Sequence, residues 1–267
     1  MKDIALQTAR RSEGQTLNVL REYIQNDILG SLQKLGIHQR LYFVGGTALR
    51  FLYRIPRFSE DLDFCAGPNW KTNDFKSTMK DVASELRLAG YDLSLHLKSE
   101  RTVQSASFRF PGILFDLGLS LRREQKLSIS IEIDVRPPAG WVGERTIINI
   151  FRPILIQHYD MKSLFTTKIA AVLTRDYIKG RDYFDLFWYL SSRKELTPQM
   201  ELLKNALAQK PDRAVSFKPA RWKAGLSAVV SSLNWKAVVR DVLPFLERTD
   251  DIHAFTQENL LLLLAHR

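Results

Sequence analysis

The stretch VGGTALRFLYRIPRFSEDLDF, residues 44–64, decides how the chain is expected to fold. The apolar run Leu41–Val44 ends at Gly45-Gly46, which predicts a strand that breaks into a tight turn. The segment TALRFLYR is typical of the first turns of a helix, and Pro56 ends it. The segment DLDFCA then predicts a second short strand.

The second strand carries two aspartates, Asp61 and Asp63. Strand side chains alternate, so both carboxylates would point to the same side. Neighbouring carboxylates repel each other unless a cation lies between them or one is protonated. Aspartate is disfavoured in strands, which argues against a merely solvated face. The pair is therefore a candidate site for a divalent ion, whereas Glu60 would face the other way.

A third acidic strand is predicted at SISIEIDV, residues 128–135. Apolar and polar residues alternate over all eight positions, which favours a half-buried strand. The polar face carries Asp134, with Glu132 as a second candidate ligand. If this strand lies beside Asp61 and Asp63, three carboxylates converge, and such a set can hold two magnesium ions for in-line phosphoryl transfer. The sequence does not determine that adjacency.

The turn Gly45-Gly46-Thr47 lies where a strand meets a helix. Glycine lets a ligand approach the backbone closely, and the free N–H groups at a helix start favour an anion such as phosphate. The glycine pair alone is more often an ordinary tight turn. Neither GxxxxGK[ST] nor GxGxxG occurs, so the sequence does not support a P-loop or dinucleotide-binding fold.

The rest of the chain predicts an α+β lobe over residues 1–158 and an all-helical lobe over residues 159–267. The first forty residues and residues 72–89 are expected to be helical. Strands are expected at Tyr91–Lys98, Val103–Phe110, Ile113–Leu119 and Lys126–Val135, followed by one apolar run, Ile147–Ile156. Helices are expected in MKSLFTTKIAAVLTRD, in RDYFDLFWYLSSR and at residues 197–208, 219–233, 234–247 and 250–266.

Composition narrows the classes of function. The chain has 267 residues, of which 45% are hydrophobic, and no run of about 18 apolar residues that would predict a transmembrane helix. The first residues lack a signal-peptide core, so we expect a cytoplasmic protein. The lone Cys65 and five scattered histidines exclude a thiolate zinc site, leaving carboxylate ligands that suit Mg²⁺ or Mn²⁺. A net charge of +10 is compatible with nucleic-acid binding or with simple solubility.

Two blocks resemble a known family. Residues 44–64 are similar to the signature of the DNA polymerase β-like nucleotidyltransferase superfamily, and more narrowly to its AbiEii branch, type IV toxin–antitoxin toxins that include the MenT toxins. The block KIAAVLTRDYIKGRDYFDL resembles a second family motif. The matching residues are Gly45, Gly46, Thr47, Arg57, Ser59, Asp61 and Asp63 in the first block, and Lys168, Arg175, Arg181, Asp182 and Asp185 in the second.

The resemblance implies a nucleotidyltransferase fold with a mixed sheet, an NTP donor, magnesium, and transfer of nucleotides to the 3′ end of tRNA. It also implies a cognate antitoxin, usually an adjacent winged-helix-type protein. The resemblance assigns metal binding to Asp61, Asp63 and Asp134. These three are also assigned as catalytic, together with Lys168 and Asp182. The resemblance assigns nucleotide binding to Gly45, Gly46, Thr47, Arg57, Ser59, Lys168 and Asp185.

Several of these side chains also have a purely structural interpretation. Lys168 could be a solvated helix lysine, and Asp182 and Asp185, three apart on one helical face, could form an ion-pair network with it or with Arg181. Arg50 and Arg57 could contact phosphate or RNA, or could be surface cations. Cys65, His158 and the aromatic cluster Tyr183, Phe184, Phe187, Trp188 and Tyr189 are interpreted as structural.

Other functions remain open at this point. The acceptor could be a protein or a small molecule such as an aminoglycoside instead of RNA. A non-catalytic nucleic-acid-binding module of the same fold would predict a damaged carboxylate set, and here the set is intact in the sequence. Nothing in the sequence argues for kinase-like phosphotransfer.

Overall fold

The computed structural model describes residues 1–12, 14–99, 102–193, 195–210 and 218–265. The chain divides into two units. The sheet unit comprises Met1–Tyr53, Phe58–Arg136 and Glu144–His158, and the helical unit comprises Arg54–Arg57, Pro137–Gly143 and Tyr159–Arg267. Two short stretches that precede Tyr159 in the chain, Arg54–Arg57 and Pro137–Gly143, thus cluster with the helical unit.

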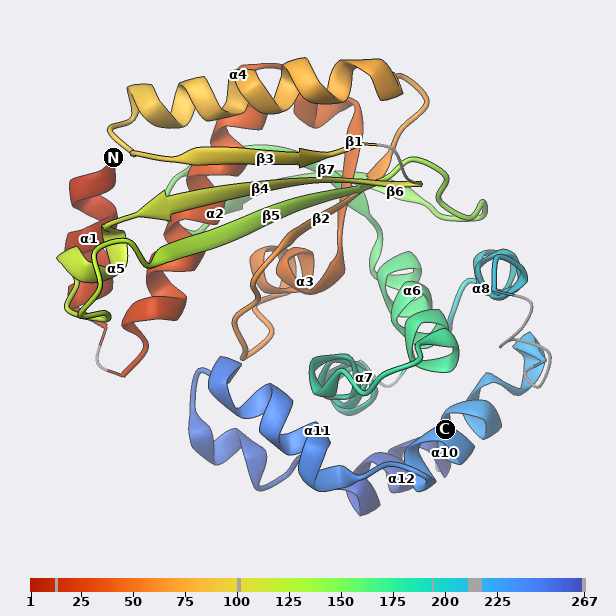
Figure 1. The fold of residues 1–267 in the computed structure, drawn as a ribbon. Helices are drawn as coiled ribbons and strands as arrows, with labels where there is room; N and C mark the ends of the chain where they lie inside the picture. The colour runs from red at the N-terminus through yellow and green to blue at the C-terminus, as the bar shows by residue number, and fades with distance from the viewer. Residues whose placement is uncertain (13, 100–101, 194, 211–217, 266–267) are drawn as a thin grey trace. The chain divides into compact units, whose positions relative to one another are not determined.

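The described part of the sheet unit contains a mixed seven-stranded sheet in the order β3-β4-β5-β2-β1-β7-β6 (Figure 1). The strands are β1 (Leu41–Val44), β2 (Leu62–Ala66), β3 (Ser94–Lys98), β4 (Val103–Pro111), β5 (Lys126–Asp134), β6 (Gly143–Asn149) and β7 (Pro153–Tyr159). β2 pairs antiparallel with β1 and parallel with β5, and β4 is antiparallel to both β3 and β5. The α+β fold class with a mixed sheet is therefore confirmed.

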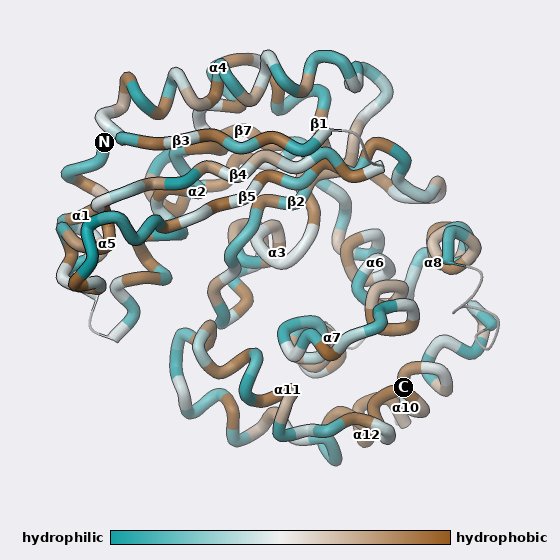
Figure 2. Tube along the Cα trace, in the orientation of Figure 1, coloured by the Kyte–Doolittle hydropathy of each residue, from teal (hydrophilic) through white to brown (hydrophobic). Residues whose placement is uncertain are grey.

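The alternation in β5 separates an apolar face of the sheet from a polar one (Figure 2). Ile129, Ile131 and Ile133 are fully buried. The β4 partners of Ile129 and Ile131 are the buried residues Phe108 and Ala106, so the apolar face continues onto β4 at these two positions. The polar face of β5 includes Glu132 and Asp134, as the sequence predicts.

Helices α1 (Lys2–Arg10), α2 (Thr16–Lys34), α3 (Gly45–Tyr53) and α4 (Phe75–Leu88) complete the sheet unit, with short 3-10 turns at Ile37–Gln39 and Thr72–Asp74. Polar side chains buried on α2 hold the segment that leads into β2. Gln25 Nε2 donates to the carbonyl oxygens of Ser59 and Glu60, at 3.1 and 2.8 Å. Because carbonyls buried without partners are costly, these bonds fix the chain just before Asp61.

Arg50 on α3 is a buried structural residue. Its Nε lies 2.6 Å from Glu22 Oε1 on α2, and its guanidinium lies 4.6 Å from the centre of the Phe58 ring. The interpretation of Arg50 as a surface cation is wrong, because only 6% of the residue is exposed. The pair instead anchors α3 to α2.

One strand prediction in the sheet unit is corrected. Residues Ile113–Leu119 do not form a strand: Ile113–Asp116 form the single-turn helix α5, bounded by Gly112 and Gly118. A short apolar run carries no periodicity that separates helix from strand, and the flanking glycines punctuate it here. The apolar run Ile147–Ile156 is divided between β6 and β7, with bends at residues 150–152.

The helical unit comprises helices α6 (Met161–Thr174), α7 (Gly180–Ser192), α8 (Met200–Ala208), α10 (Trp222–Ser231), α11 (Trp235–Val242) and α12 (Gln257–Ala265). The 3-10 turns Pro219–Arg221, Leu243–Phe245 and Thr249–Ile252 lie between them. Aromatic rings fill its core: Phe165 packs on Tyr189, and Phe184 packs edge-on against Phe255. The structural interpretation of the aromatic cluster is therefore confirmed for its buried members. Among the described residues, none of the helices has the length and apolar character to span a membrane.

Candidate active site

The sheet unit places the acidic residues at neighbouring strand positions. Asp63 lies on β2, opposite Val44 of β1 and beside Glu132 of β5, while Asp61 directly precedes the strand. Asp134 pairs with Cys65, two residues further along β2. The two acidic strands are therefore adjacent, a point that the sequence left open, and the register makes Glu132 the cross-strand neighbour of Asp63.

Gly45, the first residue of α3, supports the carboxylate of Asp63. Its φ of +78° lies in the left-handed region that favours glycine. A methyl group at this position would overlap Oδ2 of Asp63 and lie 2.8 Å from its Cγ. Gly45 therefore brings the Asp63 carboxylate directly against the backbone at the start of a helix, where N–H groups favour anions.

Thr47 ties α3 to the approach of β2. Its hydroxyl donates a hydrogen bond to the carbonyl oxygen of Asp61, and the residue is fully buried. Gly46 is buried beside it, and Ser59 is half-buried in the segment that Gln25 holds. Gly45 and Thr47 of the first motif therefore contact the segment that carries Asp61 and Asp63 and hold it in place.

Asp134 is half-buried at the end of β5, and its Oδ1 accepts a hydrogen bond from the backbone N–H of Arg136 at 2.9 Å. Burial raises the pKa of Asp134, and this hydrogen bond and the charge of Arg136 oppose the rise only in part. On burial, the Asp134 carboxylate thus loses more hydration than these two interactions replace.

The acidic side chains offer oxygen ligands, which suit a hard divalent ion such as Mg²⁺. The absence of a side chain at Gly45 leaves room for the Asp63 carboxylate above the helix start. Across the residues that the structure describes, no three carboxylate, histidine or cysteine side chains are grouped closely enough to hold a metal ion. The carboxylate oxygens are therefore suitable ligands for Mg²⁺, but the side chains that the structure describes do not form a complete metal-binding site.

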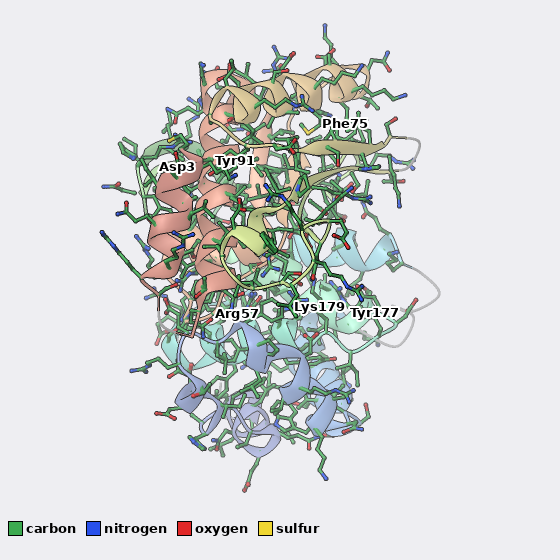
Figure 3. The ribbon with its side chains drawn as sticks, turned by 60° about the vertical axis from the view of Figure 1, so that its left-hand side comes forward. Asp3, Arg57, Phe75, Tyr91, Tyr177 and Lys179 are labelled. Carbon is green, nitrogen blue, oxygen red and sulfur yellow. The ribbon has the colours of Figure 1, made fainter. Side chains whose placement is uncertain are left out.

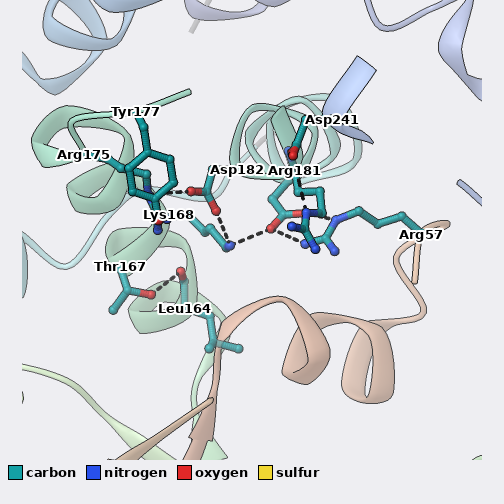
Figure 4. A network of polar contacts seen from close by, with 10 residues as sticks. Arg57, Leu164, Thr167, Lys168, Arg175, Tyr177, Arg181, Asp182 and Asp241 are labelled. Carbon is teal, nitrogen blue, oxygen red and sulfur yellow. Dashed lines mark hydrogen bonds and ion pairs between the residues drawn. The ribbon is translucent and has the colours of Figure 1, made fainter. Parts of the chain in front are cut away.

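The helical unit holds four residues of the second motif, Lys168, Arg175, Asp182 and Asp185, in a chain of ion pairs (Figure 4). Lys168 Nζ, on α6, lies 2.8 Å from Asp182 Oδ1 and 2.8 Å from Asp185 Oδ2, both on α7. Burial would lower the pKa of Lys168, but the two carboxylates outweigh it and raise that pKa. Lys168 is thus a fixed cation and not a solvated helix lysine.

Arg57 lies at the other end of this chain. Its Nε and Nη2 atoms lie 2.6 Å from the two carboxylate oxygens of Asp185, and both side chains are almost fully buried. The strand-like bridge between Arg57 and Leu246 secures the segment that carries Arg57. Arg57 and Ser59, neighbours in the first motif, therefore belong to different units.

Asp182 continues the chain to Arg175, whose Nε lies 3.2 Å from Asp182 Oδ2. Burial would raise the pKa of Asp182, but Lys168 and Arg175 outweigh it and lower that pKa to about 2. Arg181, the other partner that the sequence suggested for Asp182 and Asp185, instead pairs with Asp241, with its Nε 3.6 Å from Oδ2. Its guanidinium carbon lies 4.1 Å from the centre of the Phe245 ring. Lys168 is thus the residue that bridges the two aspartates of α7.

The lowered pKa of Asp182 predicts a pH-dependent contribution to stability. The unperturbed pKa is 3.8, so the ionised carboxylate stabilises the fold above about pH 4. That contribution, about 2 kcal/mol, is lost as the pH falls from about 4 to about 2. Urea unfolding at pH 5 and pH 2.5 should therefore show a smaller loss of unfolding free energy for Asp182→Asn than for the parent chain. Equal losses in the two proteins would contradict the assignment.

Sequence reasoning missed two features of these clusters. The cross-strand position of Glu132 beside Asp63 depends on the register of two parallel strands, which alternation alone does not determine. The bond between Arg175 and Asp182 was also missed, although their spacing across the turn between α6 and α7 allows it.

The fold is similar to those of several solved structures. JHP933 from Helicobacter pylori superimposes with a TM-score of 0.54 at 18% identity, over 93% of this chain and 89% of that one. MenT4, a nucleotidyltransferase toxin from Mycobacterium tuberculosis, superimposes with a TM-score of 0.52 at 19% identity, over 99% of each chain. At these identities the likeness supports the fold alone.

A search of curated protein sequences found no match. The family model described as nucleotidyl transferase AbiEii toxin, type IV toxin–antitoxin system, matches residues 27–257. That range includes both motifs and most of both units. The chain therefore belongs to the AbiEii family of nucleotidyltransferase toxins.

Proposed function

We propose that this protein transfers a nucleoside monophosphate from an NTP to the 3′ end of an RNA, with tRNA as the acceptor, in the cytoplasm. The observation that carries the proposal is the Asp63 carboxylate placed against the backbone of Gly45, with Asp61 braced beside it by Thr47. This arrangement puts acidic ligands next to a helix start, which suits a metal-bound triphosphate.

In the proposed reaction the 3′-hydroxyl oxygen of the acceptor bonds to the α-phosphorus of the NTP. The bond from that phosphorus to the oxygen bridging to the β-phosphate breaks, pyrophosphate leaves with the electron pair, and the hydroxyl proton passes to solvent. The N–H groups at Gly45 and Gly46 would hold phosphate oxygens, and Ser59 would add a hydroxyl. The positions of these groups orient the NTP for in-line attack.

Asp61, Asp63 and Asp134 would hold Mg²⁺ or Mn²⁺, with Glu132 as a further ligand from the same strand as Asp134. When bound, such ions lower the pKa of an attacking hydroxyl and neutralise the charge of pyrophosphate.

From its place in the second family motif, Lys168 would supply a positive charge for the triphosphate, and its ion pairs with Asp182 and Asp185 favour its charged form. Asp182 and Asp185 hold its amino group at 2.8 Å from each carboxylate. Arg57 acts through Asp185 and is better described as a positioning residue than as a direct nucleotide contact.

One consideration favours RNA as the acceptor over a protein or a small molecule, and another favours an enzyme over a binding module. The net charge of +10 attracts polyanions. The acidic pair is intact and braced, which argues against a non-catalytic binding module. Family membership also implies a cognate antitoxin, which we propose as the partner that limits the activity.

The test is label transfer from each α-³²P NTP in turn to total tRNA in the presence of magnesium. Label on tRNA from one NTP would support the proposal and identify the donor. Label only on a protein in added lysate would support nucleotide transfer but would identify a protein as the acceptor in place of RNA. No label on any acceptor, from a protein that binds magnesium and NTP, would contradict the proposed function.

Gly45→Ala is expected to reduce transfer at least tenfold. The left-handed backbone costs about 1–2 kcal/mol with a side chain, and the added methyl group displaces the Asp63 carboxylate. The measurements are initial rates of label transfer and the free energy of unfolding in urea.

Gly36→Ala is the matched control. Gly36 has a φ of +72°, and no atom lies within 4 Å of an added methyl group. It should lose similar stability but keep its transfer rate. A Gly45→Ala variant that transfers label as fast as Gly36→Ala would show that the Asp63 position does not depend on Gly45.

A further inference from the structure

The turn between α6 and α7 carries an unusually exposed aromatic side chain, Tyr177 (Figure 3). At 64% exposed, Tyr177 is the most solvent-accessible of the aromatic residues that the structure describes. An aromatic ring left in water forgoes the gain from burial, so an ordinary surface turn has no need of one. Its neighbour Ile178 is also exposed, at 39%.

The ring of Tyr177 is held in place by Arg175. The Arg175 guanidinium carbon lies 5.0 Å from the ring centre, and its Nη1 donates to the Tyr177 hydroxyl at 2.6 Å. Arg175 is in turn held by Asp182, the carboxylate that contacts Lys168 (Figure 4). A chain of polar contacts therefore connects the exposed ring to the proposed catalytic lysine within the helical unit.

The surroundings of the ring are basic. Lys179 lies close enough to Asp182 to lower the pKa of that carboxyl further. In the cluster, the four cations Arg57, Lys168, Arg175 and Lys179 face the two carboxylates of Asp182 and Asp185, an excess of two positive charges. Asp176, the single acidic residue in the turn 175–179, reduces this excess to one positive charge. An exposed ring beside surplus cations is the chemistry that binds single-stranded nucleic acid.

We infer that Tyr177 is a stacking platform for an unpaired base near the 3′ end of the RNA acceptor, with Arg175 and Lys179 as phosphate contacts. This inference rests on the proposed function and adds how the acceptor is recognised. A phosphate group alone would not require an exposed ring, and a purely apolar partner would not require the surrounding cations. Both features together match a nucleotide base and its backbone.

The experiment compares the full-length protein with its Tyr177→Ala and Tyr177→Phe variants on two RNA hairpins. One hairpin has a four-nucleotide single-stranded 3′ tail, and the other is blunt. Fluorescence anisotropy gives the Kd for each RNA, and label transfer gives kcat and the KM values for RNA and for NTP. The side chain is exposed, so both variants should fold as the parent does.

Loss of one stacked base should weaken binding of the tailed hairpin by about tenfold. We therefore expect Tyr177→Ala to raise the Kd and the KM for the tailed RNA by about that factor. The KM for NTP and the affinity for the blunt hairpin should be unchanged, because neither involves an unpaired base. Tyr177→Phe keeps the ring and should remain within about threefold of the parent.

Phe115→Ala serves as the matched control. Phe115 is another exposed aromatic, at 43%, with the Arg123 guanidinium 5.7 Å from its ring centre. It lies on α5, outside both motifs. Its removal should leave RNA binding and label transfer as they are in the parent.

The outcomes separate this inference from the proposed function. If the parent labels RNA and Tyr177→Ala binds and labels the tailed hairpin equally well, the inference is overturned and the proposed function stands. Equal weakening on both hairpins, or equal loss in Tyr177→Phe, would also overturn a stacking role. If the parent neither binds nor labels RNA, the proposed function fails and the inference fails with it.

Discussion

Asp63→Ala is expected to lower the rate of label transfer from NTP to RNA by at least about a thousandfold, the scale of removing a group that acts as part of a catalytic unit. Asp63 is the carboxylate placed against Gly45, and it lies beside Glu132 in the sheet. Removing it deletes the central ligand of the proposed acidic set. Asp61→Ala should have a comparable effect, since Thr47 braces that residue at the start of the same strand.

The fold should tolerate the Asp63 substitution. Removing one carboxylate relieves repulsion from its acidic neighbours but gives up its place at the helix start, so the free energy of unfolding should change by no more than about 1 kcal/mol. The measurements are single-turnover transfer rates and urea unfolding, with Asp81→Ala, an exposed residue on α4, as the control. Parent-like transfer by both the Asp61 and Asp63 variants would rule out the acidic pair as the catalytic centre.

Asp185→Ala is expected to destabilise the protein by about 3–5 kcal/mol. Asp185 is fully buried and pairs with Arg57 through both carboxylate oxygens while also contacting Lys168. Its removal leaves the Arg57 guanidinium buried with its principal charge partner gone. The cost of such a stranded charge exceeds the net contribution of the intact pair.

Urea unfolding at pH 7 measures this effect. Asp116→Ala is the control, because its ion pair with Lys2 is about 30% exposed and should contribute no more than about 1 kcal/mol. The double variant Arg57→Met with Asp185→Leu should recover part of the lost stability, since it leaves no stranded charge. If Asp185→Ala loses no more unfolding free energy than Asp116→Ala, the ion pair between Arg57 and Asp185 contributes little to stability.

The roles of the arginines illustrate where sequence reasoning reached its limit. Arg50 and Arg57 look alike in the sequence, as cations flanking the acidic pair. In the structure Arg50 joins α3 to α2 through Glu22, while Arg57 is paired with Asp185, 128 positions along the chain. Charge and spacing do not distinguish a buried cation from a surface one, because burial depends on elements distant in sequence.

Strand predictions were right where periodicity was strong and wrong where it was absent. Eight alternating residues predicted β5. The apolar run Ile113–Leu119 has no such period, and a helix turn formed between two glycines instead. No sequence pattern predicts a role for Tyr177, because a single aromatic residue in a turn has no periodicity. Its exposure and its contact with Arg175 are properties of the folded chain.

The sequence by itself determined the α+β class, the helical character of the second half, and the residues of the two motifs, because these depend on local periodicity, turn residues and residue identity. The tertiary structure alone decided the parallel pairing of β2 with β5, which puts Glu132 beside Asp63, and the burial of Lys168 between two aspartates. Strand register and ion-pair partners depend on contacts between residues far apart in the chain, and no local pattern encodes those contacts.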